Sequence, residues 1–150
     1  MDKIAELFHN YVLITALLSW FVAQVLKTLL TLIVTKKFTP ERLVGAGGMP
    51  SAHSATVCSL VVAISREVGF HTPEFAIAVV LAAVVMYDAM GVRRAAGEQA
   101  KVLNKMLERQ YGDEEDSEFA VELKEFLGHT PLQVLAGALL GILIAMIMPR

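Results

Sequence analysis

Long apolar runs, bounded by charged or turn-forming residues, dominate the hydrophobic pattern of this chain. Four runs have the length that a helix needs to cross a hydrocarbon core, which is about 20 residues with roughly 17 to 25 tolerated. They cover approximately residues 11–34, 52–68, 74–90 and 131–148. The second and third runs are short, which is typical of helices that cross a thin membrane or whose ends are buried in protein. We therefore predict an all-α, polytopic membrane helix bundle that forms one domain over residues 1–150.

A further helix is predicted between the third and fourth runs. From Val92 to Leu103 and Met106, apolar residues recur at helical spacing, and basic residues lie on the other faces. This pattern predicts an amphipathic helix over about residues 92–111, lying along the membrane surface. The acidic run that follows, residues 113–116, is most simply a solvated loop.

Composition supports the membrane class and narrows the partners. Hydrophobic residues make up 55% of the chain, and the mean hydropathy is +0.57. The net charge of −2 and the lack of a basic stretch interleaved with aromatic residues argue against a nucleic-acid partner. Because no histidine pair has the four-residue spacing of a metal site, we expect neither a metal nor a cofactor. The N-terminus lacks signal-peptide features, so the first run is expected to stay as an anchor.

The distribution of basic residues predicts the orientation in the membrane. Of the 13 lysines and arginines, three lie in the 35–50 loop and six in the 91–131 segment. The positive-inside rule therefore predicts a multi-pass protein of the cell membrane, with both segments in the cytoplasm and both termini outside. A phosphate site would also concentrate basic residues, whichever way it faced.

The stretch from Gly45 to Ser54 is rich in residues that could shape an anion site at the start of the second span. The glycines, Gly48 among them, let backbone approach a ligand, and Pro50 suits the first turn of a helix. The amides of Ser51 and the next two residues would then point outward at the positive end of the helix dipole. A flexible loop before an ordinary helix start, with serines satisfying backbone groups, explains the stretch equally well.

His129 opens the fourth span directly before Thr130 and Gln133, which have the spacing of a capping box. The box does not itself need His129. His71 begins the third span in the same way, although that span starts on the opposite side of the membrane. At least one of the two histidines must therefore belong to helix-start chemistry alone.

Polar residues inside the first span share one helix face: Gln24, Lys27, Thr31 and Thr35. This stripe favours an internal polar cavity, and a lysine within a span is a functional candidate. At the end of the third span, Asp88 has a simple structural role available, since arginines that it could pair with follow closely.

The predicted topology brings these candidates to one membrane face. Those expected there, besides the inner end of the Lys27 stripe, are His53, Asp88, Arg93, Arg94 and His129. Two histidines, several cations and a helix N-terminus can hold a tetrahedral anion. One imidazole can attack phosphorus while the other protonates the leaving oxygen.

The segment Gly48-Met49-Pro50-Ser51-Ala52-His53-Ser54 resembles the Pro-Ser-Gly-His element of the type 2 phosphatidic acid phosphatases and vanadium-dependent haloperoxidases. The chain is most similar to the small, divergent membrane branch of that superfamily. Nearly the whole chain takes part in this resemblance, through residues 23–27, 87–94, 97–100 and 128–131.

The resemblance implies roles for particular residues. Lys27 and one of the arginines, Arg93 or Arg94, would bind phosphate, His53 would be the acid, and His129 would be the nucleophile. The chain departs from the family pattern in three ways. The first motif lacks its arginine-proline partner, the third motif's arginine and histidine lie much farther apart, and Gln133 stands where an aspartate is expected. Gln133 could orient an imidazole without stabilising its cation, and Asp88 could supply the missing carboxylate.

We therefore predict a metal-independent membrane phosphatase that acts on a lipid phosphate or diphosphate through a histidine nucleophile. The alternative is a non-catalytic membrane protein that binds anionic lipid or assembles with partners through the same basic face. Vanadate-dependent oxidation of halide is a third, less favoured alternative. Four spans are few to enclose a lipid head group, which favours a homo-oligomer. Gly137 and Gly141 could serve its interface, or could equally pack within the monomer.

Overall fold

The computed structural model describes residues 3–36, 48–111 and 128–150, without the side chains of residues 3, 4, 92–94 and 108–111. These residues form helices and connections, with no strand among them. The helices are α1 (Lys3–Phe8), α2 (Tyr11–Thr35), α3 (Ala52–Val68), α4 (Pro73–Met90), α5 (Val92–Tyr111) and α6 (Pro131–Ile147). The predicted all-helical fold class is confirmed.

Short polar residues set where the longer helices begin. Asn10, Ser51, Thr72 and Thr130 are the N-caps of α2, α3, α4 and α6, and each side chain accepts a backbone N–H of its helix's first turn. At α3, the prediction that proline occupies the first turn is wrong, because Pro50 precedes the cap. At α6 the predicted capping box is present in both directions.

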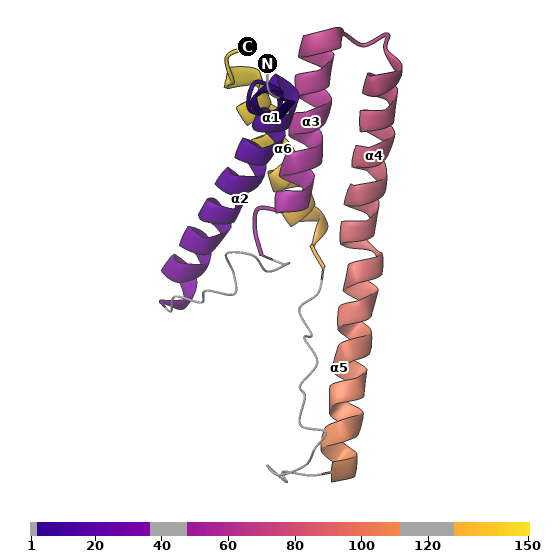
Figure 1. The fold of residues 1–150 in the computed structure, drawn as a ribbon. Coiled ribbons are helices and arrows are strands. Elements are labelled where there is room, and N and C mark those ends of the chain that lie inside the picture. The colour runs from indigo at the N-terminus through magenta and orange to yellow at the C-terminus, as the bar shows by residue number, and fades with distance from the viewer. Residues whose placement is uncertain (1–2, 37–47, 112–127) are drawn as a thin grey trace.

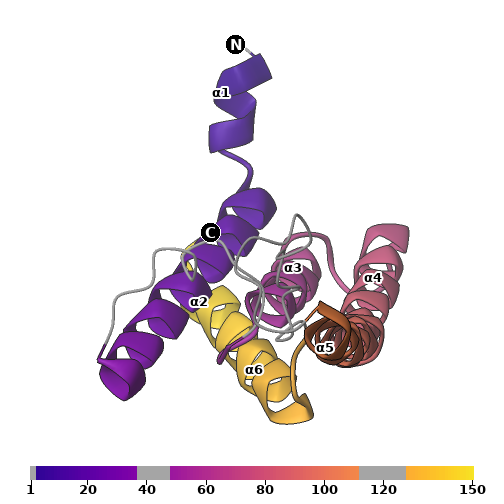
Figure 2. The same ribbon diagram turned by 90° about the horizontal axis from the view of Figure 1, so that it is seen from below.

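Helix α3 is the centre of the bundle. It packs against α2, α4 and α6, and Figure 2 shows it between α2 and α4 with α6 alongside. Hydroxyl groups of α3 donate hydrogen bonds to carbonyls of the same helix. Thr56 donates to the Ala52 carbonyl and Ser59 to the Thr56 carbonyl, both at 2.8 Å. Because other helices surround α3, it can carry this polarity while lipid contacts are left to the outer helices.

Small and polar residues fill the interior of the bundle, and large apolar ones cover its outside. Ala23, Ala52 and Ala55 form a buried cluster with Leu140 packed against it. Most leucines of α2 and α6 are exposed, which is the pattern of a bundle packed through small residues in lipid. The largest fully buried side chains are Lys27, Thr15, Ser19, Ser51, Ser54 and Ser59.

The glycine pair of α6 packs inside the monomer. A Cβ added at Gly137 would overlap the Ser51 carbonyl oxygen, and one added at Gly141 would overlap the Ala55 carbonyl oxygen. The two helix backbones therefore touch directly, as small residues allow in membrane helices. The glycine pair could have served a subunit interface or packing within the monomer, and the structure supports packing of α6 on α3. A homo-oligomer stays a prediction, and the glycine pair no longer argues for it.

Arg66, in the last turn of α3, ties three helices together at the end where both termini lie (Figure 1). Its guanidinium donates to the Met148 carbonyl at 2.9 Å, to the Tyr11 hydroxyl at 2.7 Å, and to the Ala145 carbonyl. A cation beside the last carbonyls of α6 is favoured by the helix dipole. This arginine is therefore a structural clamp as well as a charge in the topology count.

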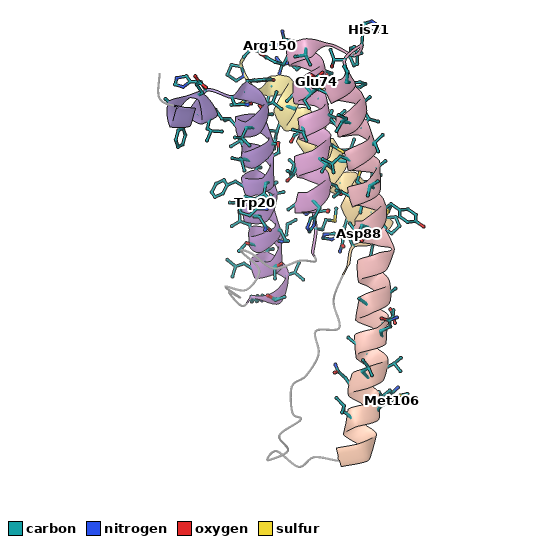
Figure 3. The ribbon with its side chains drawn as sticks, turned by 45° about the vertical axis from the view of Figure 1, so that its right-hand side comes forward. Trp20, His71, Glu74, Asp88, Met106 and Arg150 are labelled. Carbon is teal, nitrogen blue, oxygen red and sulfur yellow. The ribbon has the colours of Figure 1, made fainter. Side chains whose placement is uncertain are left out.

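Helix α5 continues in nearly the same direction as α4 and extends beyond the bundle (Figures 1 and 3). The predicted turn onto a membrane surface is absent, because helical hydrogen bonding passes through Gly91. Its N–H donates to the Tyr87 carbonyl, and the Ala95 N–H donates to the Gly91 carbonyl, both at 2.9 Å. Val102, Leu103 and Met106 of the amphipathic helix are exposed.

Within the part of the chain that the structure describes, two helical segments are long and apolar enough to cross a membrane: Tyr11–Thr35 and the combined α4–α5 segment Pro73–Leu107. Helix α6 is apolar but shorter, and α3 is less apolar. The number of four crossings stays a prediction.

Candidate functional site

His53 and His129 lie together, although they come from distant parts of the sequence. Their ring centroids are 5.9 Å apart, and the rings meet edge to face at 63°. Two backbone hydrogen bonds position them. The Ser51 N–H donates to the Gln133 carbonyl, and the His129 N–H donates to the Ala89 carbonyl, both at 3.0 Å. The entries into α3 and α6 and the end of α4 are thereby held at one end of the bundle.

The His129 ring is buried and contacts a residue in the first turn of its own helix. The side chain is 3% exposed, and its Nδ1 lies 3.3 Å from Oε1 of Gln133. The same oxygen accepts the Thr130 N–H at 3.0 Å, as part of the capping box. From the sequence, Gln133 was expected both in the capping box and as a residue that could orient an imidazole. In the structure, one oxygen of Gln133 makes both contacts.

Lys27 lies against the loop that precedes α3. Its side chain is 2% exposed, and a Cβ added at Gly48 would lie 3.0 Å from its Cγ and 3.1 Å from its Cδ. Gly48 also has a φ of +85°, which side chains rarely adopt. Position 48 therefore requires glycine for two reasons, its backbone conformation and the close approach of Lys27. The lysine stem thus lies against the predicted anion-binding loop.

The polar stripe on α2 is buried only in part. Gln24 is 6% exposed, whereas Thr31 is half-buried and Thr35 is exposed. The two threonine hydroxyls donate to carbonyls of their own helix, at 2.9 and 2.8 Å. The prediction that all four residues face an internal cavity is wrong for Thr35, which is exposed.

The amide and the hydroxyl oxygen of Ser51 are engaged in hydrogen bonds that hold the start of α3. Its amide donates to Gln133, and its Oγ accepts the Ser54 N–H at 3.4 Å and the Ser54 hydroxyl at 3.1 Å. The expectation that its amide points outward toward an anion is therefore wrong. That Ser51 binds phosphate stays a prediction. The group that Ser51 could offer to a phosphate oxygen is its hydroxyl proton.

Asp88 lies at the same end of the bundle as the histidine pair, whereas His71 lies at the opposite end of α4 (Figure 3). Asp88 is half-buried and directly precedes Ala89, whose carbonyl accepts the His129 N–H. Exposed His71 thus belongs to a helix start far from the pair. Arg93 and Arg94 lie in the first turn of α5, but their side chains are outside the described residues, so their roles stay predictions.

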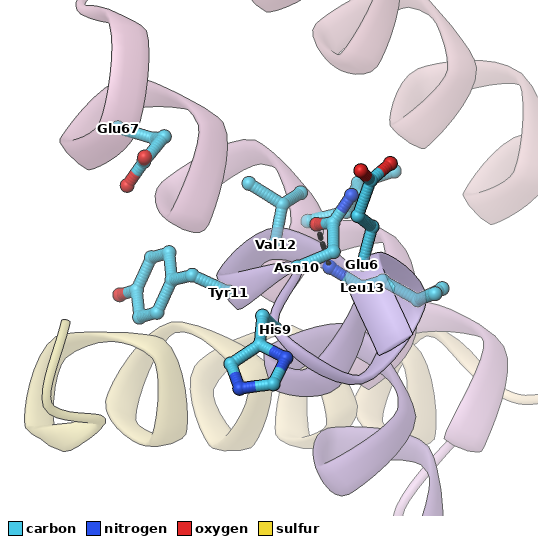
Figure 4. A pocket seen from close by; sticks show the side chains of 8 residues that line it. Glu6, His9, Asn10, Tyr11, Val12, Leu13 and Glu67 are labelled. Carbon is cyan, nitrogen blue, oxygen red and sulfur yellow. Dashed lines mark hydrogen bonds between the residues drawn. The ribbon is translucent and has the colours of Figure 1, made fainter. Parts of the chain in front are cut away.

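A cavity of about 490 Å³, shown in Figure 4, opens at the end of the bundle opposite His53 and His129. It lies where α1 and the start of α2 meet α3, and Glu6, His9 and Glu67 are on its rim. Its position separates it from the candidate chemistry. Within the described ranges 3–36, 48–111 and 128–150, no three His, Cys, Asp or Glu side chains are grouped as they would be around a metal ion.

These features define a helical membrane protein with a histidine pair and a buried lysine near the entry of its central helix. The chain belongs to the divergent PAP2 family. Residues 8–144 match the sequence pattern of that family. It is also similar to the uncharacterized membrane protein YuiD of Bacillus subtilis (strain 168). The two are 39% identical over 152 residues, which cover 95% of this chain and 96% of that protein. No solved structure matches the chain significantly.

Proposed function

We propose that this protein hydrolyses a lipid phosphate or diphosphate through a phosphohistidine on His129. The observation that carries the proposal is the 5.9 Å separation of the His53 and His129 rings. Acid–base groups act within about 3 Å of the atoms they serve, so two rings at this separation can contact one phosphoryl group together. Membership of a family named for phosphatidic acid phosphatases agrees with this chemistry.

The reaction would proceed in two balanced steps. An imidazole lone pair of His129 forms the N–P bond, the P–O bond to the lipid breaks, and the leaving oxygen takes a proton from His53. Water then attacks phosphorus and gives a proton to His53, and phosphate leaves His129. Lys27 would hold the phosphoryl oxygens, since a cation buried in the bundle interior acts at low dielectric.

Phosphate release from purified protein, measured with a panel of lipid phosphates with and without vanadate, tests this proposal. We expect His53→Ala and His129→Ala each to lower kcat by at least about 100-fold while the protein stays folded and membrane-inserted. His71→Ala is the matched control, because His71 also precedes a Thr-Pro helix start but lies at the opposite end of α4.

Near-normal turnover in either variant would contradict the assigned pair and favour a mechanism through Asp88. A wild-type protein that binds anionic vesicles but releases no phosphate from any lipid would instead support the non-catalytic alternative.

We also propose that the histidine end of the bundle faces the cytoplasm of a cell membrane. The basic residues near that end support this orientation, and at the opposite end Arg66 is occupied by the clamp on α6.

A further inference from the structure

The cavity at the end of the bundle opposite the histidine pair combines carboxylates with apolar side chains. Glu6 of α1 and His9 line it from one part of the chain, and Glu67 lines it from the last turn of α3. Figure 4 shows Glu67 on one side of the cavity and Glu6 on the other. Val12 and Leu60 add apolar surface to the lining. The volume of about 490 Å³ lies within the range of small-molecule sites, roughly 300–1,000 Å³.

Helix α1 has the orientation of a helix that lies on a membrane surface. It points away from the bundle, across the direction of α3 and α4 (Figures 1 and 2). Leu7 and Phe8 of this helix are exposed, as in amphipathic segments whose apolar side chains enter the lipid. Helix α2, which is long and apolar enough to cross the membrane, begins at Tyr11 directly afterwards. A cavity between these two helices therefore lies at the level of the lipid head groups.

The carboxylates of Glu6 and Glu67 give this cavity a negative charge. Arg66 directly precedes Glu67, but its guanidinium donates to the Tyr11 hydroxyl and to the carbonyls of Ala145 and Met148. Its hydrogen bonds are thus directed to the clamp on α6. An occupant that complements the cavity must therefore carry a positive charge of its own.

His9 adds a further hydrogen-bond acceptor to the lining. Its Nδ1 lies 2.7 Å from the Ala5 carbonyl, which can only accept, so Nδ1 carries the proton of the neutral ring. Nε2 then has a lone pair to offer. Two carboxylates and one imidazole nitrogen match the three N–H donors of a primary ammonium group. A quaternary ammonium has the same charge but no N–H to donate.

We propose that this cavity binds a phospholipid whose head group ends in a primary ammonium. The ammonium group lies between Glu6 and Glu67, and the lipid continues along the apolar surface of Val12 and Leu60. This lipid joins α1 to α3 across the cavity. The inference does not depend on the proposed phosphatase function, because the cavity is at the other end of the bundle.

Lipid binding to the purified full chain in detergent, measured by native mass spectrometry, tests this proposal. Phosphatidylethanolamine, phosphatidylcholine and phosphatidylglycerol with identical acyl chains are compared. We expect phosphatidylethanolamine to bind about threefold to tenfold more tightly than the other two, as two exposed charge pairs allow. It should also raise Tm more than they do. In about 1 M salt, where the Debye length is about 3 Å, the preference should disappear.

The double variant Glu6→Gln with Glu67→Gln keeps the shape of the cavity and removes its charge, so it should bind the three lipids without preference. Glu74→Gln is the matched control and should keep the preference. Glu74 is exposed in the first turn of α4 at the same end of the bundle, but it does not line the cavity (Figure 3).

Equal binding of phosphatidylethanolamine and phosphatidylcholine by the wild-type protein would overturn the inference. A preference that survives in the double variant would overturn it as well. Loss of the preference in Glu74→Gln would also contradict it, because the general charge of the surface, rather than the cavity, would then attract the ammonium group.

Discussion

The contact between α3 and α6 is tested by adding one methyl group at Gly137. The new Cβ would overlap the Ser51 carbonyl oxygen and lie 3.0 Å from its carbonyl carbon and 3.1 Å from the Ser51 Cβ. Carbon atoms normally pack at about 3.5 Å or more, and the overlap with the carbonyl oxygen is deeper than these two contacts, so α6 must move away by on the order of 1 Å. Three of the atoms in this contact belong to one capping residue, which cannot turn aside as a long side chain could.

Two effects of the substitution lower the free energy of unfolding, and one raises it. Overpacking costs about 1 to 3 kcal/mol, and weakening the Ser51–Gln133 hydrogen bond adds about 1 kcal/mol. Replacing glycine with alanine inside a helix returns about 1 kcal/mol through helix propensity. We therefore expect Gly137→Ala to lower the free energy of unfolding by about 1 to 3 kcal/mol. Activity should fall as well, because the same movement separates His129 from His53.

Unfolding in mixed detergent, followed through the fluorescence of the single tryptophan, Trp20, measures this loss. Leu139→Ala is the control on the same helix, since Leu139 is 60% exposed on the outer surface. It should change stability by less than about 0.5 kcal/mol. A Gly137→Ala protein as stable as wild type, but converted from oligomer to monomer, would refute the intramolecular packing and return the glycine pair to a subunit interface.

Two further predictions concern charge and orientation. Lys27→Met, which keeps the stem beside Gly48 but removes the ammonium, should raise KM for phosphate substrates; an unchanged KM would exclude Lys27 from the phosphate site. In a Cys58→Ala background, a membrane-impermeant thiol reagent should label His71→Cys in intact cells but Lys105→Cys only after permeabilisation. The reverse labelling would place the site outside.

Much of the fold could be predicted from the sequence because its signals are local. The cap at Thr130 follows from residue type and spacing, and it fixes where α6 begins. At α3 the sequence predicted the region of the helix start correctly but placed Pro50 inside the helix, whereas Ser51 is the cap. Alternation of helix direction then predicts that His53 and His129 lie at the same end, which is where the structure brings them. The same reasoning sends His71 to the opposite end.

Other features depend on contacts that no local pattern specifies. Gly91 could end a helix or let it continue, and only the hydrogen bonds on both sides of it show that α4 passes into α5. A glycine pair on a membrane helix is equally suited to a neighbouring chain and to a neighbouring helix. Arg66 reaches carbonyls more than seventy residues away, so its role as a clamp has no signature near position 66.

The glycines of α6 and the chemistry at its start are parts of one arrangement. Gly137 lets the α6 backbone approach Ser51, and that approach brings the Ser51 N–H within 3.0 Å of the Gln133 carbonyl. Gln133 holds His129 through its side chain while its backbone holds the residue that caps the helix of His53. A side chain at position 137 would therefore act on both histidines without touching either. In a bundle whose interior is built from alanine, glycine and serine, the geometry of the pair depends on backbone contact rather than on interlocking large side chains.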